Sequence, residues 1–221
     1  MPKVERTPTE FETVSLRLFG AAWAYVRSAV YCRSNPAAKS PSTDEEFFKR
    51  VSSELLLLSV EQSLKLILYL KDVCFDIDHD LYQLYAKTAS IQDAHDGNSL
   101  IGTVVRLMNE MGRARGYSGF TEEEVCNCLK VHRSLYKDLR YFGVDRKLRP
   151  IELRSVQCKD YQTIQWLSLS LIATNLLALR SHEIEVEWPF TTRGEPITAS
   201  DLTNFLVGLD FSDRTLRQLD D

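Results

Sequence analysis

The sequence predicts an all-α protein, an antiparallel bundle of about five to six helices with a short C-terminal appendage. Apolar residues recur at spacings of three and four along most of the chain, as one buried face of a helix requires. Glycine and proline are few, at nine and seven of 221 residues. They lie mostly near the ends or at evident breaks, which leaves long segments free to be helical. With 44% apolar and 26% charged residues, the chain can also fill a complete core.

Two long helices are expected first. One spans about residues 9–32 and ends before the turn-rich loop RSNPAAKSPS. The other begins at STDEEF, where Ser42 or Thr43 can cap the helix and three acids suit the positive end of its dipole. It continues through VSSELLLLSVEQSLKLILYLKD, which is apolar almost all round apart from three charged residues. Such a helix belongs at the centre of a bundle.

Four further helices follow, separated by the polar loops QDAHDGNS and GRARGYSGF and by a charged connection. The third of these opens with TEEE, in which Thr121 and Glu124 stand at the spacing of a capping box. We expect the four helices at about residues 80–89, 100–111, 121–142 and 156–180.

The sequence predicts two parts, a helical bundle at residues 1–182 and a C-terminal extension at 183–221. The extension starts with EIEVEWPF, which alternates like a short strand or an extended arm, and two short helices are expected after it. The N-terminus has no basic and apolar run typical of a signal peptide. The longest uncharged segment, residues 161–179, is too polar to span a membrane. We therefore expect a cytoplasmic protein that does not contact a membrane.

The cysteines are odd in number and are not spaced as zinc-binding pairs. Cys126 and Cys128 are two apart in a helical pattern, so their side chains point about 200° apart and cannot chelate one ion. We expect reduced thiols, no metal and no cofactor. The five positions are Cys32, Cys74, Cys126, Cys128 and Cys158.

The polar cluster in CFDIDHDLYQLY allows two interpretations. One is a divalent metal site like that of HD-type phosphohydrolases, which are all-helical and use an early His, a His-Asp doublet and a distant Asp. The matching residues would be His79, His95 with Asp96, and Asp138 or Asp145. However, the doublet stands in the polar, loop-like segment SIQDAHDGNS, whereas those enzymes place it in a dry pocket. We keep this interpretation as the third alternative.

The other interpretation is a helix start. Asp78 can accept hydrogen bonds from the free N–H groups of the following turn, and Asp80 lies in the first turn, where negative charge is favoured. The apolar residues that follow supply the buried stripe. The capping interpretation gives His79 no role. We expect His79 to make a structural hydrogen bond at the end of the bundle.

The order of these segments resembles the HEPN family of helical bundles. In that family a core helix reading like ElalKa is followed by gHdL at the start of the next helix. The resemblance in the order of the helices covers about residues 10–179. The residues that match the family pattern itself all lie within 54–85. Asp78 stands where the family commonly has glycine. The corresponding residues are Glu61, Leu64, Lys65, His79, Asp80 and Leu81.

The resemblance implies a homodimer and an RNA- or nucleotide-related role of the kind found in defence or stress response. In many members of the family it also implies RNA cleavage without metal. In such cleavage an Arg holds the phosphate, and a His four to six residues further along moves the proton of the attacking 2′-OH. This chain departs from that pattern, because no histidine has an arginine five to seven positions before it. Whether RNA is cleaved is therefore left open.

The segment HRSLYKDLRYF offers these groups in reversed order. His132 and Arg140 are eight apart, so they lie along one side of the expected helix, where His132 could move a proton and Arg140 could hold a phosphate. In the alternative, His132 is a satisfied boundary residue and Arg140 pairs with Glu61 or Glu54.

A basic segment surrounds these residues. Residues 130–159 contain nine basic and three acidic residues, in a chain whose net charge is −4. Such a band suggests a face for phosphate or an acidic partner, with Lys130, Arg133 and Lys137 as candidate nucleic-acid contacts. The alternatives are an ordinary solvated helix face and a non-catalytic interaction module whose partner supplies the chemistry.

Overall fold

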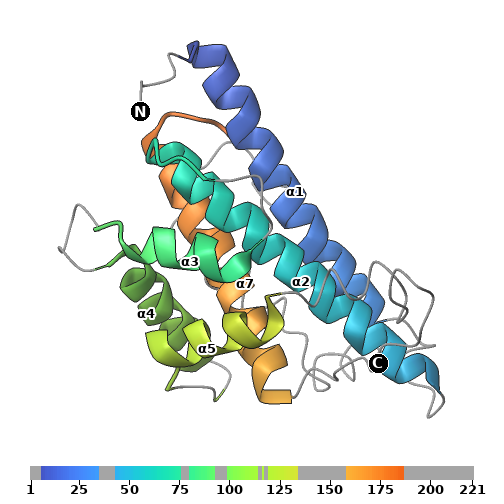
Figure 1. Cartoon of the computed structure of the whole chain (residues 1–221). Helices are drawn as coiled ribbons and strands as arrows, with labels where there is room; N and C mark the ends of the chain where they lie inside the picture. The colour runs from blue at the N-terminus through green and yellow to red at the C-terminus, as the bar shows by residue number, and fades with distance from the viewer. Residues whose placement is uncertain are drawn as a thin grey trace, which may run out of the picture.

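The computed structural model describes residues 6–34, 43–75, 80–92, 99–113, 116, 119–133 and 158–186. Within these residues the chain forms six helices and no strand, which confirms the predicted all-α class (Figure 1). One isolated antiparallel bridge joins Gln92 to Ser99. The helices are α1 (Pro8–Ser34), α2 (Thr43–Leu70), α3 (Leu81–Ala89), α4 (Leu100–Arg113), α5 (Glu122–His132) and α7 (Cys158–Ser181).

The centre of the bundle is α2, as its nearly uniform apolar sequence predicts. It runs antiparallel to α1 along most of its length and also packs against α3 and α7 (Figure 1). Leu56, Leu64, Leu66 and Leu68 are all fully buried, although they point in different directions around the helix axis. Because neighbours cover α2 on several sides, it has no wide polar face.

The shorter helices α3, α4 and α5 lie together on one side of the long helices (Figure 1). They pack against one another, and α4 and α5 also contact α7. Met108 of α4, Leu129 of α5 and Trp166 of α7 are fully buried and belong to one hydrophobic core. The core is therefore continuous from the long helices to α5, which carries the candidate site.

The interface between α2 and α7 contains paired polar groups within the apolar core. Ser168 Oγ donates a hydrogen bond to Ser59 Oγ at 2.9 Å. Asn175 Nδ2 donates to the Ser63 carbonyl at 3.1 Å. Since a buried polar group is costly when it has no partner, these bonds favour one register of α7 against α2.

The start of α3 corrects one sequence prediction. Asp80 is the N-cap, and its Oδ1 accepts hydrogen bonds from Tyr82 N at 3.0 Å and Gln83 N at 3.2 Å. It is not a first-turn acid behind a cap at Asp78, because its own backbone is extended, with φ −84° and ψ 99°. Asp78 and His79 lie outside the described residues.

The boundary between bundle and extension is closed by hydrogen bonds after α7. Glu183 has φ +58°, its N–H donates to the Arg180 carbonyl, and the Ile184 N–H donates to the Leu179 carbonyl, both at 3.0 Å. These are the two bonds of a Schellman motif. Ile184 is buried against the core, so the first residues of the predicted extension pack on the bundle. Residues 184–186 form no strand, and 187–221 lie outside the described part of the chain.

Among the described residues, none of the helices combines the length and apolar character that crossing a membrane requires.

Candidate functional site

The N-terminus of α5 is fixed by the predicted capping box. Thr121 Oγ1 accepts a hydrogen bond from Glu124 N at 3.1 Å, and Glu124 Oε2 accepts one from Thr121 N at 3.2 Å. Two otherwise unpaired N–H groups are thus satisfied reciprocally. The helix ends at His132 with Arg133 as C-cap. The remainder of the helix predicted to residue 142 lies outside the described residues.

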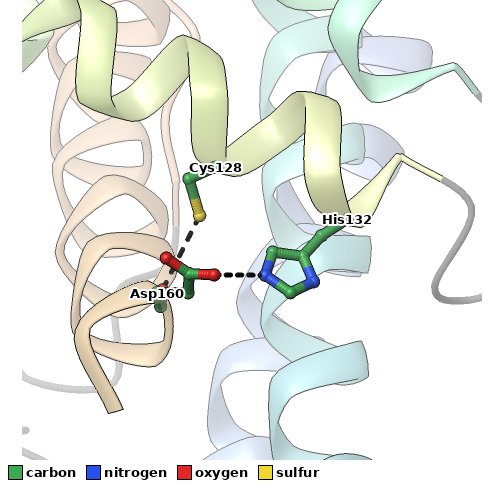
Figure 2. Close-up of side chains that lie close together, drawn as sticks. All are labelled: Cys128, His132 and Asp160. Atoms are coloured by element: carbon green, nitrogen blue, oxygen red, sulfur yellow. Dashed lines mark hydrogen bonds and ion pairs between the residues drawn. The ribbon is translucent and has the colours of Figure 1, made fainter. Parts of the chain in front are cut away.

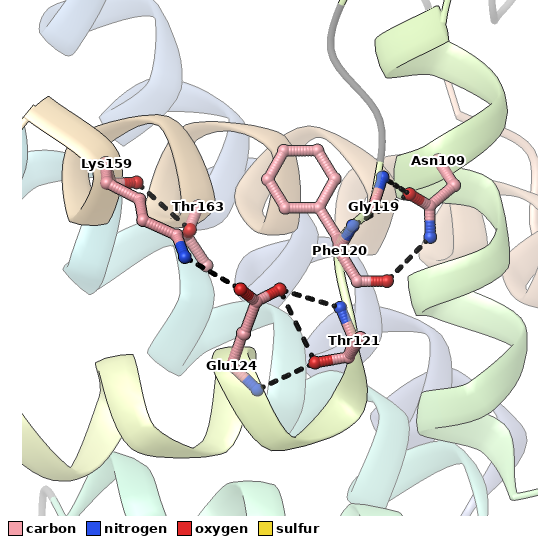
Figure 3. A network of polar contacts seen from close by, with 7 residues as sticks. All are labelled: Asn109, Gly119, Phe120, Thr121, Glu124, Lys159 and Thr163. Carbon is pink, nitrogen blue, oxygen red and sulfur yellow. Dashed lines mark hydrogen bonds and ion pairs between the residues drawn. The ribbon is translucent and has the colours of Figure 1, made fainter.

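Asn109 of α4 holds the segment that leads into α5 (Figure 3). Its Oδ1 accepts hydrogen bonds from Gly119 N and Phe120 N, both at 2.9 Å. Its Nδ2 donates to the Phe120 carbonyl at 2.8 Å and to the Val105 carbonyl at 3.0 Å. The Asn109 side chain thus pairs with the backbone N–H and C=O groups of Gly119 and Phe120 and fixes the segment that precedes α5.

Replacing Asn109 by alanine is expected to lower the free energy of unfolding by about 2 kcal/mol, because half-buried backbone groups lose their partners. Urea denaturation followed by circular dichroism measures the change. Asn127→Ala, at an exposed position of α5, is the matched control and should change the stability by less than about 0.5 kcal/mol. Equal effects of the two substitutions would contradict this role for Asn109.

The capping box also connects α5 to α7. Lys159 Nζ donates to Glu124 Oε1 at 2.7 Å (Figure 3). The hydrogen bond to Lys159 lowers the pKa of Glu124, and the same bond raises the pKa of Lys159. The Lys159 side chain is 75% exposed and that of Glu124 is 38% exposed, so solvent screens the pair and it contributes little to stability. Lys159, the last basic residue of the 130–159 segment, therefore has an acidic partner in Glu124.

On the inner side of α5, His132 is only 4% exposed and is bound to α7 (Figure 2). Its Nε2 lies 2.8 Å from Asp160 Oδ2, so the imidazole donates a hydrogen bond to the carboxylate. Cys128 lies one turn earlier, and its thiol donates to the Asp160 backbone carbonyl at 3.8 Å. Burial, and next the charge of Asp160, raises the pKa of the Cys128 thiol to about 12.

This inner cluster does not have the features of a cysteine nucleophile. A nucleophilic cysteine needs a lowered pKa and a base beside its thiol. Here the pKa of Cys128 is raised, and the thiol is directed to a carbonyl oxygen. The sulfur, the imidazole nitrogen and a carboxylate oxygen nevertheless lie within 4.8 Å of one another, so Cys128, His132 and Asp160 could together hold a metal ion.

The outer side of α5 carries two of the candidate nucleic-acid contacts. Lys130 and Arg133 are both exposed, and the three-residue spacing places them on neighbouring positions of the helix. Lys130 Nζ lies 4.9 Å from the centre of the Tyr82 ring, in a cation–π arrangement. Lys137 lies outside the described residues.

The structure separates His132 from these cations. Lys130 and His132 are two apart, so they point about 200° away from each other on α5. Correspondingly, Lys130 is exposed and His132 is buried. Arg140, the predicted phosphate ligand, lies outside the described residues, so its relation to His132 stays a prediction.

The residues that carry the HEPN resemblance are divided between described and undescribed parts of the chain. Glu61 and Lys65 form a buried ion pair within α2, with Lys65 Nζ 2.6 Å from Glu61 Oε1. Arg140 lies outside the described residues, so the alternative in which it pairs with Glu61 or Glu54 stays a prediction. The residues of the HD-type alternative lie outside the described residues: His79, His95, Asp96, Asp138 and Asp145.

Sequence reasoning missed the cluster of Cys128, His132 and Asp160. The spacing of four between Cys128 and His132 was the available signal, since it places both on one helix face. Asp160 could not be found in this way, because it belongs to another helix and lies 28 residues after His132.

Comparisons of the chain with protein-family models, with curated proteins and with solved structures find no match. The HEPN resemblance therefore stays a prediction based on the residues quoted for it.

Proposed function

We propose that this chain is a HEPN-like helical protein that binds RNA or a nucleotide through the outer side of α5, with Lys130 and Arg133 contacting phosphate. In this proposal His132 has a structural role and is not an acid/base group. The observation that carries it is the division of α5 into two sides, with exposed cations outside and an internally bonded histidine inside.

The outer side has the chemistry that a phosphate backbone requires. Lys130 and Arg133 offer fixed positive charge at a helix end, and residues 134–159, which follow them in the chain, contain seven further basic residues. Arginine and lysine provide most of the sequence-independent affinity of nucleic-acid-binding proteins.

The inner side lacks the access that catalysis requires. A general base must come within about 3 Å of the proton that it removes. The His132 ring is buried, and its Nε2 is already bonded to Asp160 in the same chain. The bond to Asp160 leaves the other ring nitrogen, Nδ1, as the possible base, but a 2′-OH would have to enter the bundle to reach the buried ring. This burial argues for binding without cleavage by His132.

The double substitution Lys130→Glu and Arg133→Glu is expected to weaken binding of labelled single-stranded RNA at least about tenfold, because each lost phosphate contact lowers the salt-dependent affinity. Fluorescence anisotropy at two salt concentrations measures the effect, with a labelled nucleotide as second ligand. Arg17→Glu with Arg27→Glu, at exposed positions of α1, is the charge-matched control. Equal loss in both double variants would show that net charge alone governs binding and would contradict a site on α5.

A second candidate function, a homodimerisation module, is favoured by a different feature. An open groove of about 750 Å³ lies between α2, α4 and the C-terminal part of α7. Its apolar lining includes Ile67, Leu70, Leu107 and Leu177, and Leu177 is 46% exposed. The groove is at the opposite end of α7 from Asp160, so it is separate from the outer side of α5.

We assign a second copy of this chain to the groove, on the basis of charge. Lys71 and Glu110 both line it, so a two-fold axis can place each beside its opposite in the partner copy. Leu177→Glu is expected to convert a dimer into a monomer in light scattering after size-exclusion chromatography, because it would bury a charge. Tyr31→Glu, at an exposed position of α1, should leave the dimer intact. A wild-type monomer at micromolar concentration would contradict this assignment.

A further inference from the structure

We propose that Cys128, His132 and Asp160 bind one divalent transition-metal ion, with zinc the best fit, which ties α5 to α7. The inference goes beyond the proposed function and does not depend on it, because the three side chains face the interior and not the outer side of α5.

The positions of the ligand atoms are close to those that a zinc ion needs. With bonds of about 2.3 Å to sulfur and 2.0–2.2 Å to nitrogen and oxygen, a tetrahedral ion separates its ligand atoms by about 3.4–3.6 Å. The three atoms of this cluster lie within 4.8 Å of one another, and the closest pair, His132 Nε2 and Asp160 Oδ2, is 2.8 Å apart. An ion would therefore have to open that hydrogen bond by only about 0.6 Å.

Two of the ligands are held by the same helix face. Cys128 and His132 are one turn apart on α5, so their side chains project in the same direction toward α7. Asp160 stands in the first turn of α7, and α5 and α7 pack against each other in the common hydrophobic core. The ligands thus come from two helices that other contacts already fix.

The donor set selects the kind of ion. Sulfur and imidazole nitrogen suit zinc and similar transition metals, whereas magnesium and calcium prefer oxygen ligands throughout. A thiolate and a carboxylate together neutralise the two positive charges of the ion, so the bound site is electrically neutral. Binding releases one proton, that of the Cys128 thiol, while the proton on Nε2 of His132 moves to Nδ1, so that the imidazole binds the ion in its neutral form.

Access and the fourth ligand are provided on the α7 side. The Asp160 side chain is 28% exposed, whereas Cys128 and His132 are buried. Water can therefore reach the ion past Asp160 and complete four-coordination, as in zinc sites with three protein ligands. The other two ligands lie in the apolar part of the interface, where displacement by solvent is disfavoured.

The first test uses cobalt as a spectroscopic probe. The full chain is freed of metal with a chelator and titrated with Co²⁺, and its zinc content after Zn²⁺ addition and desalting is measured by mass spectrometry. We expect about one ion per chain and a thiolate-to-cobalt charge-transfer band. A variant with Cys32, Cys74, Cys126 and Cys158 replaced by serine should keep the band. No ion, or no thiolate band, in the wild-type chain would overturn the proposal.

The second test uses single substitutions. Cys128→Ser should abolish the thiolate band, and Asp160→Asn should weaken zinc binding at least about tenfold. Cys126→Ser, two residues away on α5, should leave both unchanged. Zinc should raise the melting temperature of the wild-type and Cys126→Ser chains but not that of Cys128→Ser. Circular dichroism verifies the fold of each variant, and a thiolate band that persists in folded Cys128→Ser would overturn the assignment of this ligand.

Discussion

Replacing Lys65 by alanine is expected to lower the free energy of unfolding by about 3–5 kcal/mol, the effect typical of removing one partner of a buried ion pair. The Glu61 side chain is 1% exposed and lies 2.6 Å from the Lys65 ammonium in the most buried helix of the bundle. Without the cation, a carboxylate stays in a medium that solvates it poorly, and truncation also leaves a cavity beside α2.

Urea denaturation measures this effect, and two comparisons separate its causes. The double variant Glu61→Leu with Lys65→Met keeps the volume and removes both charges, so its stability should be within about 1 kcal/mol of the wild type. Lys159→Ala removes the cation of the exposed pair with Glu124 and should change the stability little. A Lys65→Ala chain as stable as Lys159→Ala would show that the α2 pair is solvated and would contradict the buried position.

Replacing Asp160 by alanine is expected to lower the free energy of unfolding by about 2–3 kcal/mol, because the buried His132 ring loses its hydrogen-bond acceptor. The bond between Nε2 and Oδ2 is 2.8 Å long and joins the end of α5 to the start of α7. The carboxyl is partly exposed, so the effect should be smaller than that of Lys65→Ala.

The measurement is made with chelator present, so that any metal contributes nothing. Asp160→Asn is the matched control, since its amide oxygen can still accept from Nε2, and it should retain more than half of the stability lost in Asp160→Ala. If Asp160→Ala unfolds at the wild-type urea concentration, then His132 is not held by this bond, which would contradict the structural role assigned to the bond.

Local sequence signals predicted most of the helical architecture. The nearly uniform apolar sequence of α2 predicted its central position, and Thr121 with Glu124 predicted the start of α5. Both signals act over a few residues, so they do not depend on the rest of the fold. The same local reasoning misplaced the α3 cap by two residues, because three nearby aspartates are all suitable N-caps and sequence alone does not show which has the extended backbone.

The environment of His132 was only partly accessible from sequence. Val125, Leu129 and His132 follow spacings of four and three, which agrees with the sequence alternative of a satisfied boundary residue. Its partner Asp160 could not be predicted, because helix packing and not chain proximity brings α7 to this point. The same limit applied to Lys65, whose role as partner of Glu61 depends on how deeply α2 is buried.

The most direct test of the central claim, that the outer side of α5 binds RNA while His132 serves the fold, is one incubation analysed in two ways. Labelled single-stranded RNA is mixed with the wild-type chain in chelator, and both binding and RNA length are followed by gel electrophoresis. We expect RNA that is bound and remains full-length. RNA cleaved by the wild-type chain and left intact by a folded His132→Gln variant would contradict the account.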